Sequence, residues 1–184
     1  MISCFKGSFR VSSPYGWRIL NEKKEFHKGI DLVATVDRNV YSICDGIAFT
    51  KFEKNGFGKY IEVRLENGLS IMYGHLDGFH IVNNTRVKAG DKIGIMGNTG
   101  NSTGYHTHLE IRVTGTKTPL DITYFTGIPN AVGVYEDGSP VFTAYESACN
   151  VERICKLEKN TISYMWKYPY ADELFSKINL KLLF

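Results

Sequence analysis

Short stretches in which apolar and polar residues alternate, separated by turn-forming residues, dominate the chain from residue 40 to residue 113. Residues 60–65 alternate between apolar and polar or amphipathic side chains, which is the period of a strand with one buried face. The following Asn67 and Gly68 favour a tight hairpin turn, and the mostly apolar residues 69–73 can pair back as the next strand. Since helical periodicity is absent from this region, the pattern predicts a mainly β fold built from antiparallel strands.

A second clear alternation covers residues 105–113, which follow a loop rich in glycine and hydroxyl side chains at residues 97–104. One face of this predicted strand is mostly apolar, whereas the other carries His106, His108, Glu110 and Arg112. Two histidines two residues apart on a strand project from the same face, with side-chain bases roughly 7 Å apart. Such a pair is able to share one metal ion.

The character of the chain changes near its C-terminal end. Residues 124–140 hold several turn-forming residues and resemble a connector. Residues 171–183 carry apolar side chains at three- and four-residue spacing, which predicts a helix. The aromatic cluster at residues 164–170 is more typical of a core than of a sugar-stacking surface. We therefore expect a β-sheet domain at residues 1–128 and a small α/β extension at residues 129–184.

The composition is that of an ordinary globular protein, with 43% hydrophobic and 22% charged residues. The net charge of +3 comes from 22 basic and 19 acidic side chains that are spread along the chain, without the dense basic cluster of a nucleic-acid binder. No apolar stretch is long enough for a membrane span or for the core of a signal peptide. We therefore expect neither a nucleic-acid partner nor a membrane span.

The cysteines give no sign of a metal site. The cysteines are Cys4, Cys44, Cys149 and Cys155. No two of them are closely spaced, and none lies next to a cluster of histidines. A zinc site built from cysteines is therefore not supported. Because a domain of this size needs no disulfide to fold, we expect free and mostly buried thiols.

Histidine and aspartate offer a different metal site. His27 and Asp31 lie four residues apart around Gly29, so a bend could bring the imidazole and the carboxylate together. Either His106 or His108 could complete the set. Two histidines and one carboxylate form a known catalytic zinc site, in which the fourth position stays open.

Further histidines could move protons beside such a metal. Catalytic zinc acidifies water to a pKa of about 7 and polarises an amide carbonyl, as amide hydrolysis requires. Histidine, with an ordinary pKa of about 6.5, can accept and return a proton near neutral pH. The candidates are His75, which follows Gly74, and whichever of His106 and His108 does not bind the metal. For His80 we expect only a structural or surface position.

Taken together, these motifs resemble those of the lysostaphin-type peptidoglycan endopeptidases. The matching elements are HKGIDL at residues 27–32, YGHL at 73–76, and GNTG at 97–100 leading into HTHLE at 106–110. Their order and spacing match from about residue 13 to residue 125. The resemblance implies a small antiparallel β-sheet or sandwich domain with a groove whose floor carries one zinc ion per chain. It also implies that the zinc ligands are His27, Asp31 and His108. The residues implied for proton transfer are His75 and His106.

The resemblance further implies the reaction, which is hydrolysis of amide bonds in the stem peptides or cross-bridges of bacterial peptidoglycan. One alternative is a catalytically silent wall-binding or virion structural protein on the same fold. That alternative predicts a missing ligand, and none is missing. A second alternative is a lipoyl- or biotinyl-type carrier, suggested by the glycine-punctuated residues 87–97. A carrier needs an exposed lysine at a hairpin tip, whereas Asn67 and Gly68 occupy the nearby tip.

A place of action follows from this expectation. The protein would work at the bacterial cell wall, either as a trimmed secreted protein or as a bacteriophage lysin. In the second case we expect association with the phage tail, where residues 129–184 would dock onto other virion proteins.

Overall fold

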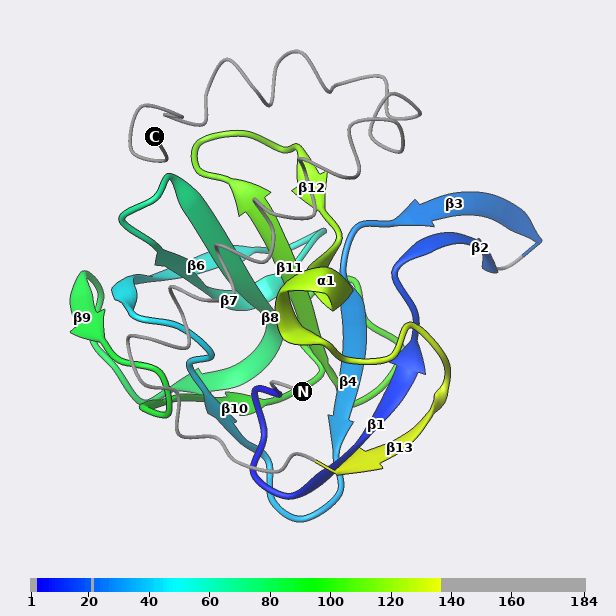
Figure 1. The fold of residues 1–184 in the computed structure, drawn as a ribbon, viewed down its shortest axis with the longest axis horizontal. Coiled ribbons are helices and arrows are strands. Elements are labelled where there is room, and N and C mark those ends of the chain that lie inside the picture. The colour runs from blue at the N-terminus through cyan, green and yellow to red at the C-terminus, as the bar shows by residue number, and fades with distance from the viewer. Residues whose placement is uncertain (1–2, 21, 137–184) are drawn as a thin grey trace.

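The computed structural model describes residues 3–20 and 22–136. This part of the chain consists mainly of β-strands and confirms the predicted antiparallel fold (Figure 1). Its elements are β1 (Ser8–Ser13), β2 (Gly16–Leu20), β3 (Lys23–His27), β4 (Ile30–Ala34), β5 (Asn39–Tyr41), β6 (Gly46–Glu53), β7 (Gly58–Arg64), β8 (Leu69–Phe79), β9 (Thr85–Val87), β10 (Lys92–Met96), β11 (Thr107–Val113), β12 (Pro119–Leu120), α1 (Ile122–Thr126) and β13 (Gly133–Glu136).

One large sheet organises the domain. Its strands follow the order β13-β1-β4-β11-β8-β7-β6-β9, while β10 pairs with β5 and β8, and β12 pairs with β11. Strands β2 and β3 form a separate two-stranded hairpin, which projects to one side of the large sheet in Figure 1. Strands β4, β11 and β8 are therefore neighbours at the centre of the large sheet, although far apart in the sequence.

Strict alternation along the central strands explains the core. Ile61 and Val63 of β7 are fully buried and lie opposite Tyr73 and Ile71 of β8. The predicted hairpin between these strands is present, with Gly68 at a φ of 84° in its turn. Burial of such side chains supplies most of the stability of a small domain, because each contributes about 1.5–3 kcal/mol when removed from water.

The opposite face of the same strands is polar. Two of its carboxylates, Glu62 of β7 and Glu110 of β11, are only 3% and 1% exposed. Glu62 pairs with Lys51 and Arg64, and Glu110 pairs with Arg112. Buried carboxylates of this kind are tolerated because neighbouring cations and hydrogen bonds compensate them.

The region after β11 contains elements that the sequence pattern did not predict. Helix α1 begins after Asp121, whose side chain accepts a hydrogen bond from the backbone N–H of Thr123. It ends at Thr126, and the following Gly127 has the left-handed conformation usual after a helix. Strand β13 then pairs antiparallel with β1, so the large sheet includes residues beyond the expected limit at 128. The division of the chain into 1–128 and 129–184 stays a prediction.

Several further expectations fall on particular residues. The thiols of Cys4 and Cys44 are buried, as predicted, and burial raises the pKa of Cys44 to about 12. Cys149, Cys155, the aromatic cluster at 164–170 and the predicted helix at 171–183 lie outside the described residues. Among the described residues, no helix has the length and apolar character needed to cross a membrane.

Candidate metal centre and active site

Three strands bring the candidate ligands together. His27 ends β3, Asp31 lies in β4, and His108 lies in β11 directly opposite Asp31 in the strand pairing. Gly29 makes the connection between β3 and β4 possible. A Cβ at Gly29 would lie 2.4 Å from the carbonyl oxygen of Leu109 and 2.7 Å from Nε2 of His108. Only glycine therefore lets this connection pass so close to β11.

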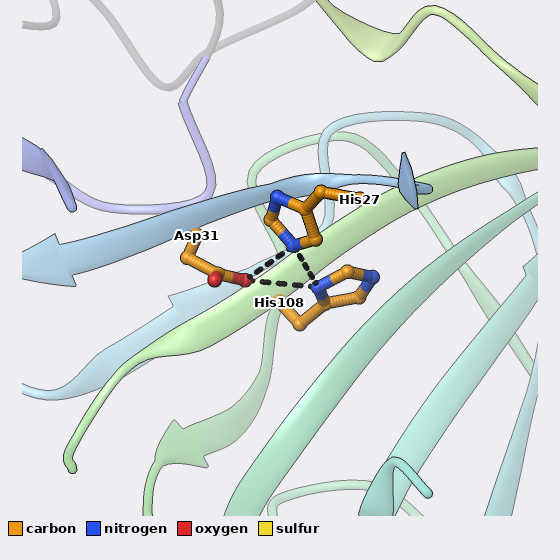
Figure 2. Close-up of side chains that lie close together, drawn as sticks. All are labelled: His27, Asp31 and His108. Carbon is orange, nitrogen blue, oxygen red and sulfur yellow. Dashed lines mark hydrogen bonds and ion pairs between the residues drawn. The ribbon is translucent and has the colours of Figure 1, made fainter. Parts of the chain in front are cut away.

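The three side chains point at one another in a buried pocket (Figure 2). Nε2 of His27 lies 3.1 Å from Nδ1 of His108 and 3.2 Å from Oδ1 of Asp31. Nδ1 of His108 lies 2.9 Å from the same oxygen. Within the described part of the chain, no other group of His, Cys, Asp and Glu side chains gathers closely enough to hold one metal ion.

Outer hydrogen bonds fix which nitrogen of each ring faces the other ligands. Nδ1 of His27 lies 2.7 Å from the carbonyl oxygen of Pro14, which can only accept, so Nδ1 donates and Nε2 is the nitrogen that faces Asp31 and His108. Nε2 of His108 likewise donates to Oε2 of Glu110 at 3.1 Å, so Nδ1 is the nitrogen directed at Asp31 and His27. Two ring nitrogens and a carboxylate oxygen therefore converge, and deprotonation of the ring nitrogens would leave a lone pair on each for a metal ion. Such a set fits a divalent cation.

The electrostatics of the pocket also favour positive charge. Burial would raise the pKa of Asp31, but hydrogen bonds from His108 and His27 outweigh burial and hold that pKa well below its usual range. Burial would lower the pKa of His108, but hydrogen bonds to Asp31 and Glu110 outweigh it and raise the pKa to about 9. Arg18 approaches the other oxygen of Asp31, with Nη1 3.4 Å from Oδ2, so Oδ1 is the oxygen directed to the histidines.

His75 occupies an unusual backbone position beside this pocket. It lies within β8 at a φ of 61°, in the left-handed region that side-chain-bearing residues rarely adopt. Its backbone N–H donates to the carbonyl of Phe57 at 2.7 Å, and its ring Nδ1 donates to the carbonyl of Thr99 at 2.9 Å. Burial lowers the pKa of His75 to about 4, so its ring is neutral at pH 7 with a lone pair on Nε2.

His106 is held in the same way as His75. Its Nδ1 donates to the carbonyl oxygen of Gly104 at 2.8 Å, and its Nε2 lies 3.6 Å from Oδ1 of Asp31. The ring centroids of His75 and His106 are 4.6 Å apart. The structure thus brings all five predicted site residues together, while His80 is exposed just after β8 and remains outside the site.

Comparison with known proteins decides the family. The profile described as Peptidase family M23 matches residues 25–121, a range that includes every candidate site residue. This chain belongs to peptidase family M23. The resemblance to lysostaphin-type peptidases found in the sequence is therefore confirmed.

Individual members of the family agree with this assignment. Over 108 residues the chain is 37% identical to the DD-carboxypeptidase/endopeptidase Mpg of Neisseria meningitidis. This match covers 58% of this chain and 25% of that protein. The catalytic domain of lysostaphin from Staphylococcus simulans has a TM-score of 0.54 and 28% identity, and the match covers 64% of this chain and 89% of that chain. A zinc-containing peptidase from Vibrio cholerae has a TM-score of 0.51 and 26% identity, over 61% of this chain and 36% of that chain. The chain thus spans about a quarter of the curated relative's length.

Several groups that support this M23 site escaped the sequence analysis. The carbonyls of Pro14, Thr99 and Gly104 orient three of the histidines. Every residue type has a main-chain carbonyl, so the sequence does not show which carbonyls do so. Glu110 could have been found, because the alternation of β11 places it on the same face as His108, and His106 directly precedes this strand. Carboxylates that hold the outer nitrogen of a metal-binding histidine are a common feature of metal sites.

Glu110 provides a first test of the pocket. We expect Glu110→Gln to weaken zinc binding about 10- to 100-fold, because a neutral amide accepts more weakly from Nε2 of His108. Glu62→Gln is the matched control, since Glu62 is equally buried on the same sheet face and is paired with Lys51 and Arg64. Competition with a coloured chelator measures both affinities. Equal weakening in the two variants would show that Glu110 acts only through the stability of the sheet.

The backbone at His75 supports a second test, of stability. A side chain in the left-handed region costs about 1–2 kcal/mol, which glycine avoids. We therefore expect the free energy of unfolding of His75→Gly to exceed that of His75→Ala by about 1 kcal/mol. Both variants lose the same imidazole contacts, so urea unfolding of the pair isolates the backbone contribution. If alanine is the more stable of the two, His75 does not carry backbone strain.

Proposed function

We propose that this chain is a zinc-dependent endopeptidase that hydrolyses amide bonds in the stem peptides or cross-bridges of bacterial peptidoglycan. The observation that carries the proposal is the convergence of three buried potential ligand atoms, from His27, Asp31 and His108, all within 4.8 Å of one another. Membership of peptidase family M23 makes hydrolysis of a peptide bond the natural reaction for this pocket.

The proposed ligands are His27, Asp31 and His108, with one ion per chain. Two imidazoles and one carboxylate suit zinc, which binds such sets with a fourth position left for water or substrate. The zinc-containing Vibrio cholerae peptidase of the same fold supports this choice of metal. Zinc bound here would supply Lewis acidity, which lowers the pKa of water to about 7 and polarises the scissile carbonyl.

The proposed proton carriers are His75 and His106. Each ring is anchored through Nδ1 to a backbone carbonyl, so Nε2 is the nitrogen left to exchange a proton. A neutral imidazole can take a proton from the attacking water and return it to the leaving amine. Because both rings flank the ligand pocket, either could also stabilise the negative charge that develops on the carbonyl oxygen.

The choice of substrate rests on the relatives. Mpg is named as a DD-carboxypeptidase/endopeptidase and lysostaphin as an antimicrobial peptidase. We propose that this chain likewise acts on the wall of a bacterium. Association with a bacteriophage particle, docking of residues 129–184 onto virion proteins, and the lack of a nucleic-acid partner stay predictions.

Product analysis tests the proposed reaction. Purified peptidoglycan with direct D-alanyl cross-links and peptidoglycan with glycine bridges would each be digested with the zinc-loaded chain. We expect new amino groups and peptides separated at one amide bond in at least one wall type, without new reducing sugar ends. A chain that holds zinc but cuts neither wall type would instead favour the silent wall-binding alternative.

A further inference from the structure

One peptide unit next to the metal pocket is held from both ends. The carbonyl oxygen of Pro14 accepts the hydrogen bond from Nδ1 of His27 at 2.7 Å. The N–H of Tyr15, which belongs to the same peptide unit, donates to Oδ1 of Asn130 at 2.8 Å. Nδ2 of Asn130 donates in return to the carbonyl oxygen of Tyr15 at 3.0 Å. The side chain of Asn130 thus pairs with the backbone of Tyr15 as a neighbouring strand would.

The rigidity of the peptide unit connects Asn130 to His27. Because the unit is planar, the direction of its N–H fixes the direction of its carbonyl. The hydrogen bond that the N–H donates also polarises the peptide unit and strengthens its carbonyl as an acceptor. The amide oxygen of Asn130 therefore influences both the angle and the strength of the bond that holds the His27 ring.

The surrounding packing holds Asn130 and Tyr15 next to each other. Asn130 lies between α1 and β13, and β13 pairs with β1, which leads directly into Pro14. The Tyr15 ring is largely buried and packs edge-on against Phe26, the residue before His27, with centroids 5.3 Å apart. Both partners thus belong to segments that the main sheet positions, although Asn130 itself is exposed.

These contacts lie outside the part of the chain that the family profile matches. The profile covers residues 25–121, whereas Tyr15 precedes that range and Asn130 follows it. The segment after residue 121 would therefore contribute to the site as well as closing the sheet.

We propose that Asn130 is a positioning residue for the metal centre. It holds the Pro14–Tyr15 peptide so that the carbonyl of Pro14 keeps Nδ1 of His27 protonated and Nε2 directed at Asp31. The inference rests on the proposed function in one respect, since it takes this pocket to be the zinc site. Asn130 does not touch the metal or the substrate, and it acts only through the peptide unit.

Zinc affinity tests the inference without reference to activity. Competition with a coloured chelator gives the dissociation constant of the full chain and its variants. We expect Asn130→Ala to bind zinc about tenfold more weakly than the unaltered chain, at the lower end of the effect seen for outer hydrogen-bond partners. Asn130→Asp keeps an oxygen that accepts from the N–H of Tyr15, so its affinity should stay within about threefold of the unaltered chain.

Asn83 offers a matched control. Its Oδ1 accepts the backbone N–H of Thr50 at 3.1 Å, and it is also exposed, but it lies in the connection between β8 and β9. We expect Asn83→Ala to lower the melting temperature of the metal-free chain about as much as Asn130→Ala does, with unchanged zinc affinity.

The outcomes separate the two proposals. If the unaltered chain binds zinc and Asn130→Ala binds it equally well, the positioning role is wrong and the proposed function stands. Weakening of Asn130→Asp to the level of Asn130→Ala would also overturn the role of the acceptor oxygen, and the aspartate variant decides the question if the alanine variant does not fold. If the unaltered chain binds no zinc, the proposed function fails, and the inference fails with it.

Discussion

Replacing His108 by alanine is expected to remove both bound zinc and hydrolysis. His108 is the central member of the pocket, since its Nδ1 lies 2.9 Å from Asp31 and 3.1 Å from His27. Loss of one of three protein ligands should weaken zinc binding by about 10³-fold, given the size of zinc-binding energies in protein sites. Metal analysis after gel filtration, together with release of amino groups from peptidoglycan, measures the two effects.

His80→Ala is the control for this experiment. His80 is exposed and lies outside the site, so the variant should keep one zinc ion and full activity. Circular dichroism would establish that His108→Ala retains its β-sheet. A folded His108→Ala chain that still holds one zinc ion would contradict the assignment of this pocket.

His75→Ala is expected to separate zinc binding from catalysis. The His75 ring contacts His106 and His108 but supplies none of the three converging ligand atoms. The zinc content should therefore stay at one ion per chain, whereas kcat should fall by about 10²- to 10⁴-fold, the usual contribution of a positioned acid or base. Steady-state rates on a soluble wall peptide and metal analysis of the same sample give both quantities.

The form of the loss matters as much as its size. A proton-transfer role predicts a lower kcat with little change in KM, because the substrate still binds. A rise in KM alone would make His75 a substrate-binding residue, and loss of zinc would make it part of the metal site.

Strands β7 and β11 are predictable from the sequence because apolar side chains alternate with polar ones along each of them. The alternation over residues 60–65 and 105–113 indicates both strands and the face of each that packs in the apolar core. Strand β11 begins only at Thr107, however, and His108 and Glu110 on its polar face are buried as well. Helix α1 was missed because five residues are too few to show a helical period. Strand β13 was missed because its partner β1 lies more than 100 residues away, and only the folded chain brings the two together.

The candidate site was predictable where chemistry depends on side-chain type. Histidine and aspartate at positions 27, 31, 75, 106 and 108 stand out because so few histidines occur in the chain. The carbonyls that orient the histidines could not be predicted, since any residue supplies a carbonyl. The left-handed backbone of His75 was equally hidden, because its position in the middle of β8 gives no turn signal.

Asn130 shows the same limit at longer range. Its hydrogen bonds to Tyr15 join residues 115 positions apart, and no local pattern marks either of them as a partner. In the sequence it belonged to a stretch that resembled a connector. Its contribution follows only from the pairing of β13 with β1, which sets this stretch beside the turn that precedes β2.

The central claim is that zinc in the pocket of His27, Asp31 and His108 enables cleavage of wall peptides. Its most direct test is the release of amino groups from purified peptidoglycan by one preparation in three states: as loaded with zinc, after stripping with a chelator, and after zinc is restored. The account predicts cleavage in the first state, none in the second, and recovery in the third. Cleavage that continues in the stripped protein, with the absence of metal verified, would contradict it.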